Sequence, residues 1–171
     1  GHSAFFGIDM RIGVVSDTHN NLKNCRKIVD LFNKSGVEKV VHTGDITQPK
    51  TLDVFSKLEA PLFGVFGNND DGELIGLKDS AKKNLFHFVS PPLELEWAKT
   101  NIVVVHDPLE LNGLDLSSYH LVLHGHTHRE TIIKKGNQLT FNPGECAGLM
   151  AGLNNIGVVD LKKLTAEIIK F

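Results

Sequence analysis

Apolar runs of strand length alternate with helical patterns in the first third of the chain. The runs are rich in β-branched residues and end in polar loops, and between them apolar positions recur with helical spacing. The elements predicted from this pattern are a strand over 11–16, a helix over 22–35, a strand over 39–43, a helix over 49–58 and a strand over 62–66. Successive strands joined by helices favour parallel order with right-handed crossovers.

The remainder of the chain has a different pattern, with short strand candidates and short connections. These candidates cover 86–89, 93–97, 102–106, 121–124, 132–134, 139–142 and 156–160, and KKGN at 134–137 is typical of a hairpin turn. No internal repeat, low-complexity tract or linker interrupts them. We therefore predict a single α/β domain over 10–171, in which two β-sheets pack face to face with helices outside them.

Polar side chains gather where the first three predicted strands end. Asp17 and His19 follow the first strand, Asp45 follows the second and Asn68 follows the third. Because the carboxyl ends of parallel strands lie at one edge of a sheet, we expect these residues to converge there. His106 ends a later apolar run in a similar way.

Three histidines lie close together in LHGHTHR at 123–129. In an extended segment residues two apart point the same way, so His126 and His128 can address one locus, as can the aspartate and histidine of SDTH. His124 points the other way in this alternation and is predicted to be structural. Gly125 allows the backbone to bend closely around the locus.

The donors gathered in these loops are oxygen and imidazole groups, and no thiolate joins them. Such a set suits Mn²⁺, Fe²⁺, Ni²⁺, Co²⁺ or Zn²⁺ better than a thiolate zinc site or an all-oxygen calcium site. The sequence therefore predicts a site for divalent metal ions at the strand ends.

Five short motifs occur in a characteristic order: SDTH, GD, GNND, the isolated His106 and GHTH. Their order and intervals resemble the five signature blocks of the calcineurin-like metallophosphoesterases, over nearly the whole chain after residue 10. NPGE at 142–145, followed by Cys146, further resembles the small archaeal and bacterial phosphodiesterases of that family. The resemblance implies a four-layer αββα sandwich of two mixed β-sheets flanked by helices, and a metal-dependent phosphoric ester hydrolase.

Carried over residue by residue, the resemblance implies two divalent metal ions. One would be bound by Asp17, His19, Asp45 and His128, and the other by Asp45, Asn68, His106 and His126. Asp45 would bridge the two ions. Metal ions about 3.5–4 Å apart can hold a shared hydroxide that attacks phosphorus, and they neutralise charge on the phosphoryl oxygens.

Asn69 departs from the pattern, because phosphomonoesterases and protein phosphatases of the family usually carry there a histidine that protonates the leaving group. An amide cannot act as this acid, although it can hydrogen-bond to a phosphoryl oxygen. We therefore expect a small phosphodiester or nucleotide-like substrate, with phosphomonoesterase activity as the alternative. Asp70, which ordinarily orients that histidine, is expected to order the loop, whereas Asp107 either narrows the site or repels anionic substrates.

The composition restricts partners and location. The chain is 41% apolar and 22% charged with a net charge of −2, and it lacks the basic stripe that an extended nucleic acid requires. Cys25 and Cys146 lie far apart, so a reducing, cytoplasmic location is expected. No segment approaches the roughly 18 apolar residues of a membrane span. Residues 1–9 are expected to be a cloning remnant or a short N-terminal arm.

A different class of function also has this fold: the small retromer subunit is a protein-binding scaffold with an impaired metal site. All the predicted ligand positions are retained in this sequence, which favours an enzyme over a scaffold. The resemblance leaves open a homodimer or a homotetramer. LMAGL at 149–153 is predicted to pack in the core, with an apolar contact surface as the alternative.

Overall fold

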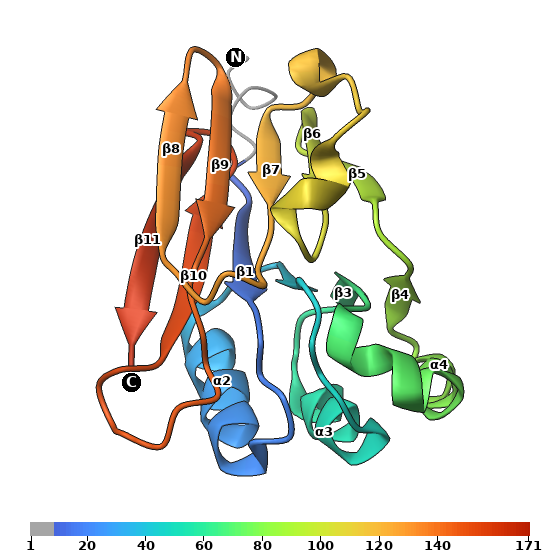
Figure 1. The fold of residues 1–171 in the computed structure, drawn as a ribbon. Helices are drawn as coiled ribbons and strands as arrows, with labels where there is room; N and C mark the ends of the chain where they lie inside the picture. The colour runs from blue at the N-terminus through green and yellow to red at the C-terminus, as the bar shows by residue number, and fades with distance from the viewer. Residues whose placement is uncertain (1–8) are drawn as a thin grey trace.

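Two mixed β-sheets, of six and five strands, face each other in the computed structural model, which describes residues 9–171 (Figure 1). The predicted cloning remnant or arm over 1–9 therefore lies outside the described residues, apart from Asp9. The two sheets and their helices confirm the predicted α/β architecture.

The predicted strands and helices occur along the chain in the predicted order. The six-stranded sheet has the order β11 (Thr165–Lys170), β10 (Asn155–Asp160), β1 (Arg11–Val15), β2 (Lys39–His42), β3 (Leu62–Val65) and β4 (His87–Val89). The five-stranded sheet has the order β5 (Leu93–Trp97), β6 (Thr100–Val104), β7 (Leu121–Leu123), β9 (Gln138–Asn142) and β8 (Thr131–Lys135). The α-helices are α2 (Leu22–Ser35), α3 (Pro49–Val54) and α4 (Leu74–Lys83), and the 3₁₀ helices are η1 (Phe55–Lys57), η2 (Asn68–Glu73), η3 (Pro108–Leu111) and η4 (Leu116–Ser118).

Parallel pairing brings the ends of several strands to one region. Strands β1, β2, β3 and β4 are parallel, with Val14 opposite Val41 and Val41 opposite Phe63. In the other sheet β6, β7 and β9 are parallel, with Val104 opposite Leu123. The predicted convergence of the strand ends is therefore confirmed, and both sheets contribute loops to it.

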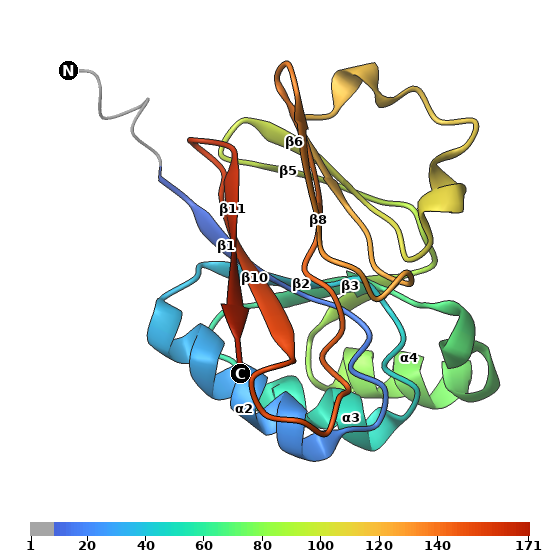
Figure 2. The ribbon, with the colours of Figure 1, turned by 60° about the vertical axis from the view of Figure 1, so that its left-hand side comes forward.

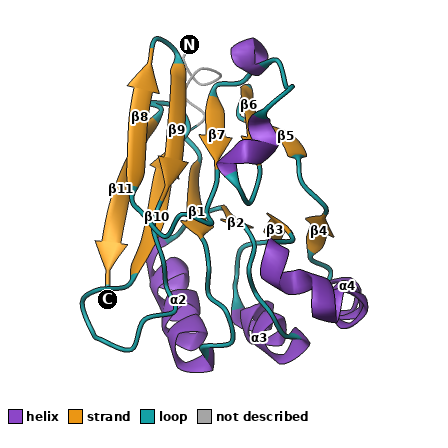
Figure 3. Cartoon of the chain, in the orientation of Figure 1, coloured by secondary structure: helices purple, strands orange, loops and turns teal. Residues whose placement is uncertain are grey.

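The alternation of side chains along each strand builds two layers of core. On β1, Ile12 and Val14 point between the sheets, where they pack with Val104 and Phe141 of the other sheet. Val15 points the opposite way, into the core that α2, α3 and α4 cover. Figures 2 and 3 show these three helices on the outer side of the six-stranded sheet, and Figure 2 shows the short η3 and η4 beyond the five-stranded one.

Helix α2 illustrates why these elements begin and end where they do. The Asn21 side chain accepts a hydrogen bond from the backbone N–H of Asn24 and so caps the first turn. Gly36 ends the helix in the left-handed conformation, with φ 67°. Cys25, Ile28 and Phe32 line the buried face in between.

One α-helix and one strand were not predicted, and the prediction for one segment is wrong. Helix α4 has few apolar positions and its pattern is interrupted by Gly76, and β11 is an edge strand, so neither is predicted by the sequence pattern. The prediction that the segment 149–153 packs in the core is wrong: Leu149, Met150 and Leu153 are exposed, because the segment forms a turn between β9 and β10 rather than an element.

Among the described residues, none of the helices is both long enough and apolar enough to cross a membrane.

Candidate metal centre

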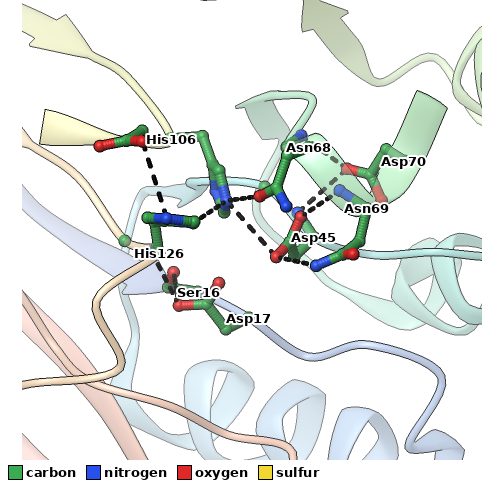
Figure 4. A network of polar contacts seen from close by, with 12 residues as sticks. Ser16, Asp17, Asp45, Asn68, Asn69, Asp70, His106 and His126 are labelled. Atoms are coloured by element: carbon green, nitrogen blue, oxygen red, sulfur yellow. Dashed lines mark hydrogen bonds and ion pairs between the residues drawn. The ribbon is translucent and has the colours of Figure 1, made fainter. Parts of the chain in front are cut away.

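The loops that follow β1, β2, β3, β6 and β7 meet between the ends of the two sheets, and they carry all the predicted ligand residues. Figure 4 shows five of them: Asp17, Asp45, Asn68, His106 and His126. Six of these residues fall into two groups, Asp17 with His19 and His128, and Asp45 with His106 and His126. Within each group one donor atom per residue lies within 4.8 Å of the others. Each group holds three of the four residues of one ligand set that the resemblance implied.

The first group is built around a buried carboxylate. Asp17 is fully buried, and its Oδ2 accepts hydrogen bonds from the Ser16 hydroxyl at 2.7 Å and the His126 backbone N–H at 3.1 Å. Its Oδ1 has no hydrogen-bond partner and lies 3.8 Å from His128 Nε2. A buried carboxylate oxygen without a donor is costly, and a cation beside it would remove that cost.

The second group is built around His106, whose side chain is 2% exposed. Its Nδ1 lies 2.9 Å from the Thr43 carbonyl oxygen, which orients the ring so that Nε2 faces the site. That Nε2 lies 2.9 Å from Asn68 Oδ1, 3.4 Å from Asp45 Oδ2 and 3.3 Å from His126 Nδ1. Four donor groups therefore converge on one small space, and Asn68 is among them as predicted.

Asp45, a member of the second group, also faces the first group. Its Oδ2 is 3.4 Å from His106 Nε2 of the second group and 3.9 Å from His19 Nε2 of the first. A single carboxylate therefore faces ligands of both groups, which is the position that a bridging ligand requires.

The local backbone at these residues is not extended, contrary to the prediction from the sequence. Asp17, His19, Asp45, His126 and His128 all have positive φ, between 46° and 68°. The left-handed conformation disfavours residues with a side chain, and such strain gathers at functional sites. The assumption of extended backbone is therefore wrong, because these side chains converge through left-handed turns. His126 and His128 nevertheless fall into different groups, as the resemblance implied.

Asn69 also points into the site. Its backbone N–H donates to Asp45 Oδ1 at 3.0 Å, and its side-chain amide donates to Asp45 Oδ2 at 2.9 Å. The side chain at the position of the missing histidine is therefore a hydrogen-bond donor beside the central carboxylate.

Asp70 orders the loops, as predicted. Its buried carboxylate accepts hydrogen bonds from the backbone N–H groups of Asp45, Ile46, Thr47 and Gly67, at 2.7–3.0 Å. Burial raises the pKa of Asp70, although these hydrogen bonds act in the opposite direction. Asp70 thus joins the loop after β2 to the loop after β3.

Burial and close charges shift the pKa values of the central groups. Burial raises the pKa of Asp17. Burial also acts to raise the pKa of Asp45, but hydrogen bonds from His106 and Asn69 hold it well below its usual range. For His106, burial lowers the pKa, but the hydrogen bond and charge of Asp45 outweigh it and raise the pKa to about 9.

The donor set fits divalent metal ions. Asp17 and Asp45 form ion pairs only with histidines in the described part of the chain. Two buried carboxylates, imidazole nitrogens facing inward and an unpartnered Asp17 oxygen together favour bound cations.

Two further histidines support the site from outside. His42 is fully buried, and its ring nitrogens lie 2.9 Å from Thr18 Oγ1 and 3.0 Å from the Gly44 backbone N–H, which donates to it. It therefore joins the loops after β1 and β2 and has a structural role, although it matches none of the sequence motifs. His124 is buried and its Nδ1 lies 3.3 Å from the Gly125 carbonyl oxygen, which agrees with its predicted structural role.

A cavity of about 290 Å³ adjoins the second group, and Asn68 and His106 form part of its wall. Phe66, Leu74 and Pro91 contribute apolar surface, and the acidic residues Asp71, Asp107 and Glu110 also line it. Asp107 therefore narrows the approach to the site and places a negative charge in it.

The comparisons with known proteins agree with this geometry. The model of the calcineurin-like phosphoesterase superfamily domain matches residues 10–164. A phosphodiesterase of Methanocaldococcus jannaschii is 34% identical over 159 residues, which cover 90% of this chain and 95% of that protein. A solved archaeal phosphodiesterase has a TM-score of 0.86 and 31% identity, over 95% of this chain and 100% of that one.

A solved phosphoesterase of E. coli, YfcE, shows the same fold, with a TM-score of 0.68 at 19% identity over 94% of this chain and 99% of that one. The match over most of the chain, together with the retained motifs, defines the class of protein: the chain belongs to the calcineurin-like phosphoesterase superfamily. Within this superfamily it belongs with the small archaeal and bacterial enzymes, and it is a phosphoric ester hydrolase.

Proposed function

We propose that the protein hydrolyses small phosphodiesters with the help of two divalent metal ions. The observation that carries this proposal is the position of Asp45, whose Oδ2 faces His19 of one ligand group and His106 of the other. When bound, a pair of ions polarises the phosphoryl group and lowers the pKa of the attacking water. Asp17, His19, Asp45 and His128 would hold one ion, and Asp45, Asn68, His106 and His126 the other.

The remaining residues of the site position the ester. Asn69, whose amide now donates to Asp45, is placed to donate to a phosphoryl oxygen instead when substrate binds. It cannot protonate a leaving group, so esters with acidic leaving groups are favoured. A cavity of about 290 Å³ suits a small ester better than a polymer. The name of the 34% identical relative from M. jannaschii, a phosphodiesterase, supports the same substrate class.

Mn²⁺, Ni²⁺, Fe²⁺, Co²⁺ and Zn²⁺ all suit these donors, and availability decides among them. The two cysteines are free and buried, which agrees with a reducing, cytoplasmic location.

The test is turnover of bis(p-nitrophenyl) phosphate beside p-nitrophenyl phosphate by metal-stripped protein, with each divalent ion added back singly. We expect hydrolysis that depends on metal and is faster on the diester. Asp45→Ala should abolish turnover and lower the bound metal, whereas Asp79→Ala, at an exposed position of α4, should retain turnover. Silence with every metal would instead favour a protein-binding scaffold.

Asn69→His tests the account of the leaving group. Histidine at this position can supply the missing acid, so phosphomonoesterase activity should rise relative to phosphodiesterase activity by about 10-fold or more. The measurement is the ratio of kcat/KM for the two nitrophenyl substrates, with Asn69→Ala as the control that removes the amide without adding an acid. An unchanged ratio in Asn69→His would contradict the account.

A further inference from the structure

The turn formed by NPGE, residues 142–145, lies against the GHTH loop, and its function is not explained by the ligand set. Asn142 is fully buried, and its side-chain amide donates to the Gly125 carbonyl oxygen at 3.3 Å and to Thr127 Oγ1 at 3.1 Å. Its Oδ1 accepts a hydrogen bond from the Gly144 backbone N–H at 2.9 Å. One buried amide therefore joins the turn to the loop that carries His126 and His128.

Glu145 extends this connection to one of the histidines. Its Oε2 lies 3.3 Å from His128 Nδ1, while His128 Nε2 faces Asp17 Oδ1 at 3.8 Å. The Glu145 backbone is held in place because its carbonyl oxygen accepts a hydrogen bond from the Asn155 N–H of β10 at 3.1 Å. The carboxylate thus contacts the ring nitrogen that points away from the first ligand group.

Asp107 contacts His126 in the same way as Glu145 contacts His128. Its Oδ2 lies 3.6 Å from His126 Nε2, while His126 Nδ1 faces His106 Nε2 at 3.3 Å. The other carboxylate oxygen, Oδ1, accepts a hydrogen bond from the Leu109 backbone N–H at 3.0 Å and so fixes the side chain at the start of η3. Each histidine of GHTH therefore has one nitrogen toward a ligand group and the other toward a carboxylate.

We propose that Glu145 and Asp107 are positioning residues that orient His128 and His126, respectively, for two different metal ions. This inference rests on the proposed function. A carboxylate beside one ring nitrogen favours the tautomer that carries its proton on that nitrogen, so the opposite nitrogen keeps the lone pair that would bind an ion. The contacts also restrict rotation of the two side chains, of which His128 is 41% exposed and His126 is 40% exposed.

According to this proposal, removal of Glu145 and removal of Asp107 weaken the binding of different metal ions. Removing such a partner typically costs 10–100-fold in metal affinity. Glu145→Ala should therefore weaken the binding event that depends on His128 and leave the other within about twofold. Asp107→Asn should weaken the event that depends on His126, because an amide has one acceptor oxygen and cannot serve both the Leu109 N–H and the histidine.

Glu130 offers a matched control. Its side chain is 45% exposed, against 44% for Glu145, and it lies two residues from His128 in the chain. It pairs instead with Lys170 Nζ at 2.7 Å and with the Asn155 side-chain amide at 2.8 Å. Glu130→Ala thus removes an equal charge from the loop that carries His128, without removing a partner of the histidine.

The experiment is calorimetric titration of metal-stripped protein with Mn²⁺ alone. The variants are Glu145→Ala, His128→Ala and their double variant, with Glu130→Ala as the control and thermal unfolding as the check of folding. Glu145→Ala should weaken the affinity of one Mn²⁺ binding event 10–100-fold, and Glu145→Gln should restore part of that affinity. When His128 is already alanine, adding Glu145→Ala should change the affinity less than twofold. This loss of effect separates positioning of His128 from a general structural role.

The inference would be overturned if Glu145→Ala bound both ions as tightly as the natural chain, if Glu130→Ala weakened binding equally, or if the effect of Glu145→Ala persisted without His128. Turnover of bis(p-nitrophenyl) phosphate is measured separately. If the natural chain binds Mn²⁺ but does not turn over the ester, only the proposed function is overturned. If it turns over the ester but Glu145→Ala leaves the Mn²⁺ affinity unchanged, only this inference is overturned. If the natural chain binds no Mn²⁺, both are overturned.

Discussion

Single residues that are not themselves predicted ligands determine where the ligands lie. Asp70 is the strongest example, because one buried carboxylate accepts four backbone hydrogen bonds from the loops after β2 and β3. Those loops carry Asp45 and Asn68. The position of the Asp45 carboxylate therefore depends on Asp70, which is hydrogen-bonded to the backbone of Asp45 and not to its side chain.

Asp70→Ala should lower the free energy of unfolding of the metal-free protein by more than about 3 kcal/mol, because each buried N–H left without an acceptor costs about 1–3 kcal/mol. Its neighbour Asp71 is exposed, so Asp71→Ala should stay within about 0.5 kcal/mol of the natural chain. Urea unfolding of both variants measures the difference. Equal stabilities would show that the loops hold their shape without the Asp70 carboxylate.

Because His42 is buried, we expect the free energy of unfolding to depend on pH. Burial lowers its pKa from 6.5 to about 3, so between these values the unfolded chain binds a proton that the folded chain does not. The contribution of His42 to stability is complete above pH 6.5. It is lost as the pH falls toward 3, by at most about 1.4 kcal/mol per pH unit.

His42→Asn removes the titrating group, and its amide oxygen can still accept from the Gly44 N–H. The free energy of unfolding of the metal-free variant should therefore fall less steeply between pH 6.5 and 4 than that of the natural chain. Urea unfolding at several pH values measures both slopes. Parallel slopes would mean that His42 is already protonated in the folded protein.

At the scale of elements, the loops at the strand ends are packed too closely to accept larger side chains. Gly125 lies at the start of the GHTH turn, where a Cβ atom would overlap the Ser16 hydroxyl and approach Thr43 Oγ1 to 2.6 Å. The loops after β1, β2 and β7 therefore meet at this glycine. Close approach, rather than a left-handed backbone, explains the need for glycine here.

Gly125→Ala should push the GHTH turn away from the other loops, lowering the free energy of unfolding by about 1–3 kcal/mol and weakening metal binding. Gly72 is the control, because a Cβ atom there meets nothing within 4 Å. Denaturation and Mn²⁺ titration of both variants are the measurements. If Gly125→Ala matched Gly72→Ala in both, the loops would be more adaptable than the structure indicates.

At the scale of the whole molecule, the candidate site joins the two sheets. Asp17 and Asp45 follow strands of the six-stranded sheet, whereas His106, His126 and His128 follow strands of the five-stranded sheet. An ion bound to ligands from both sheets would be lost on unfolding, so binding and folding should be coupled.

Saturation with Mn²⁺ should therefore raise the midpoint of thermal unfolding. At about 1,000 times the Kd, one bound ion adds about 4 kcal/mol, which corresponds to roughly 8–16 °C for a chain of this size. Differential scanning calorimetry with Mn²⁺ and then with excess chelator measures the shift. Asp45→Ala should show a much smaller shift, and an equal shift would indicate that the metal binds elsewhere.

The sequence by itself determined the strands that lead to the site and the set of donors at their ends. Both follow from local information, because strand periodicity and parallel order place Asp17, Asp45 and Asn68 at one edge. The resemblance to the phosphoesterases, carried by short motifs, divided those donors into two groups. The edge strand β11 and helix α4 escaped prediction because their local patterns are weak.

Only the tertiary structure decided how the donors are held. The left-handed turns at Asp17 and His126, the four hydrogen bonds to Asp70, and the contact of Glu145 with His128 join residues far apart in the chain. The exposure of Leu149 likewise depends on what packs against it. A local pattern records which side chains are present, whereas the contacts that orient them arise only when distant loops are brought together by packing of the two sheets.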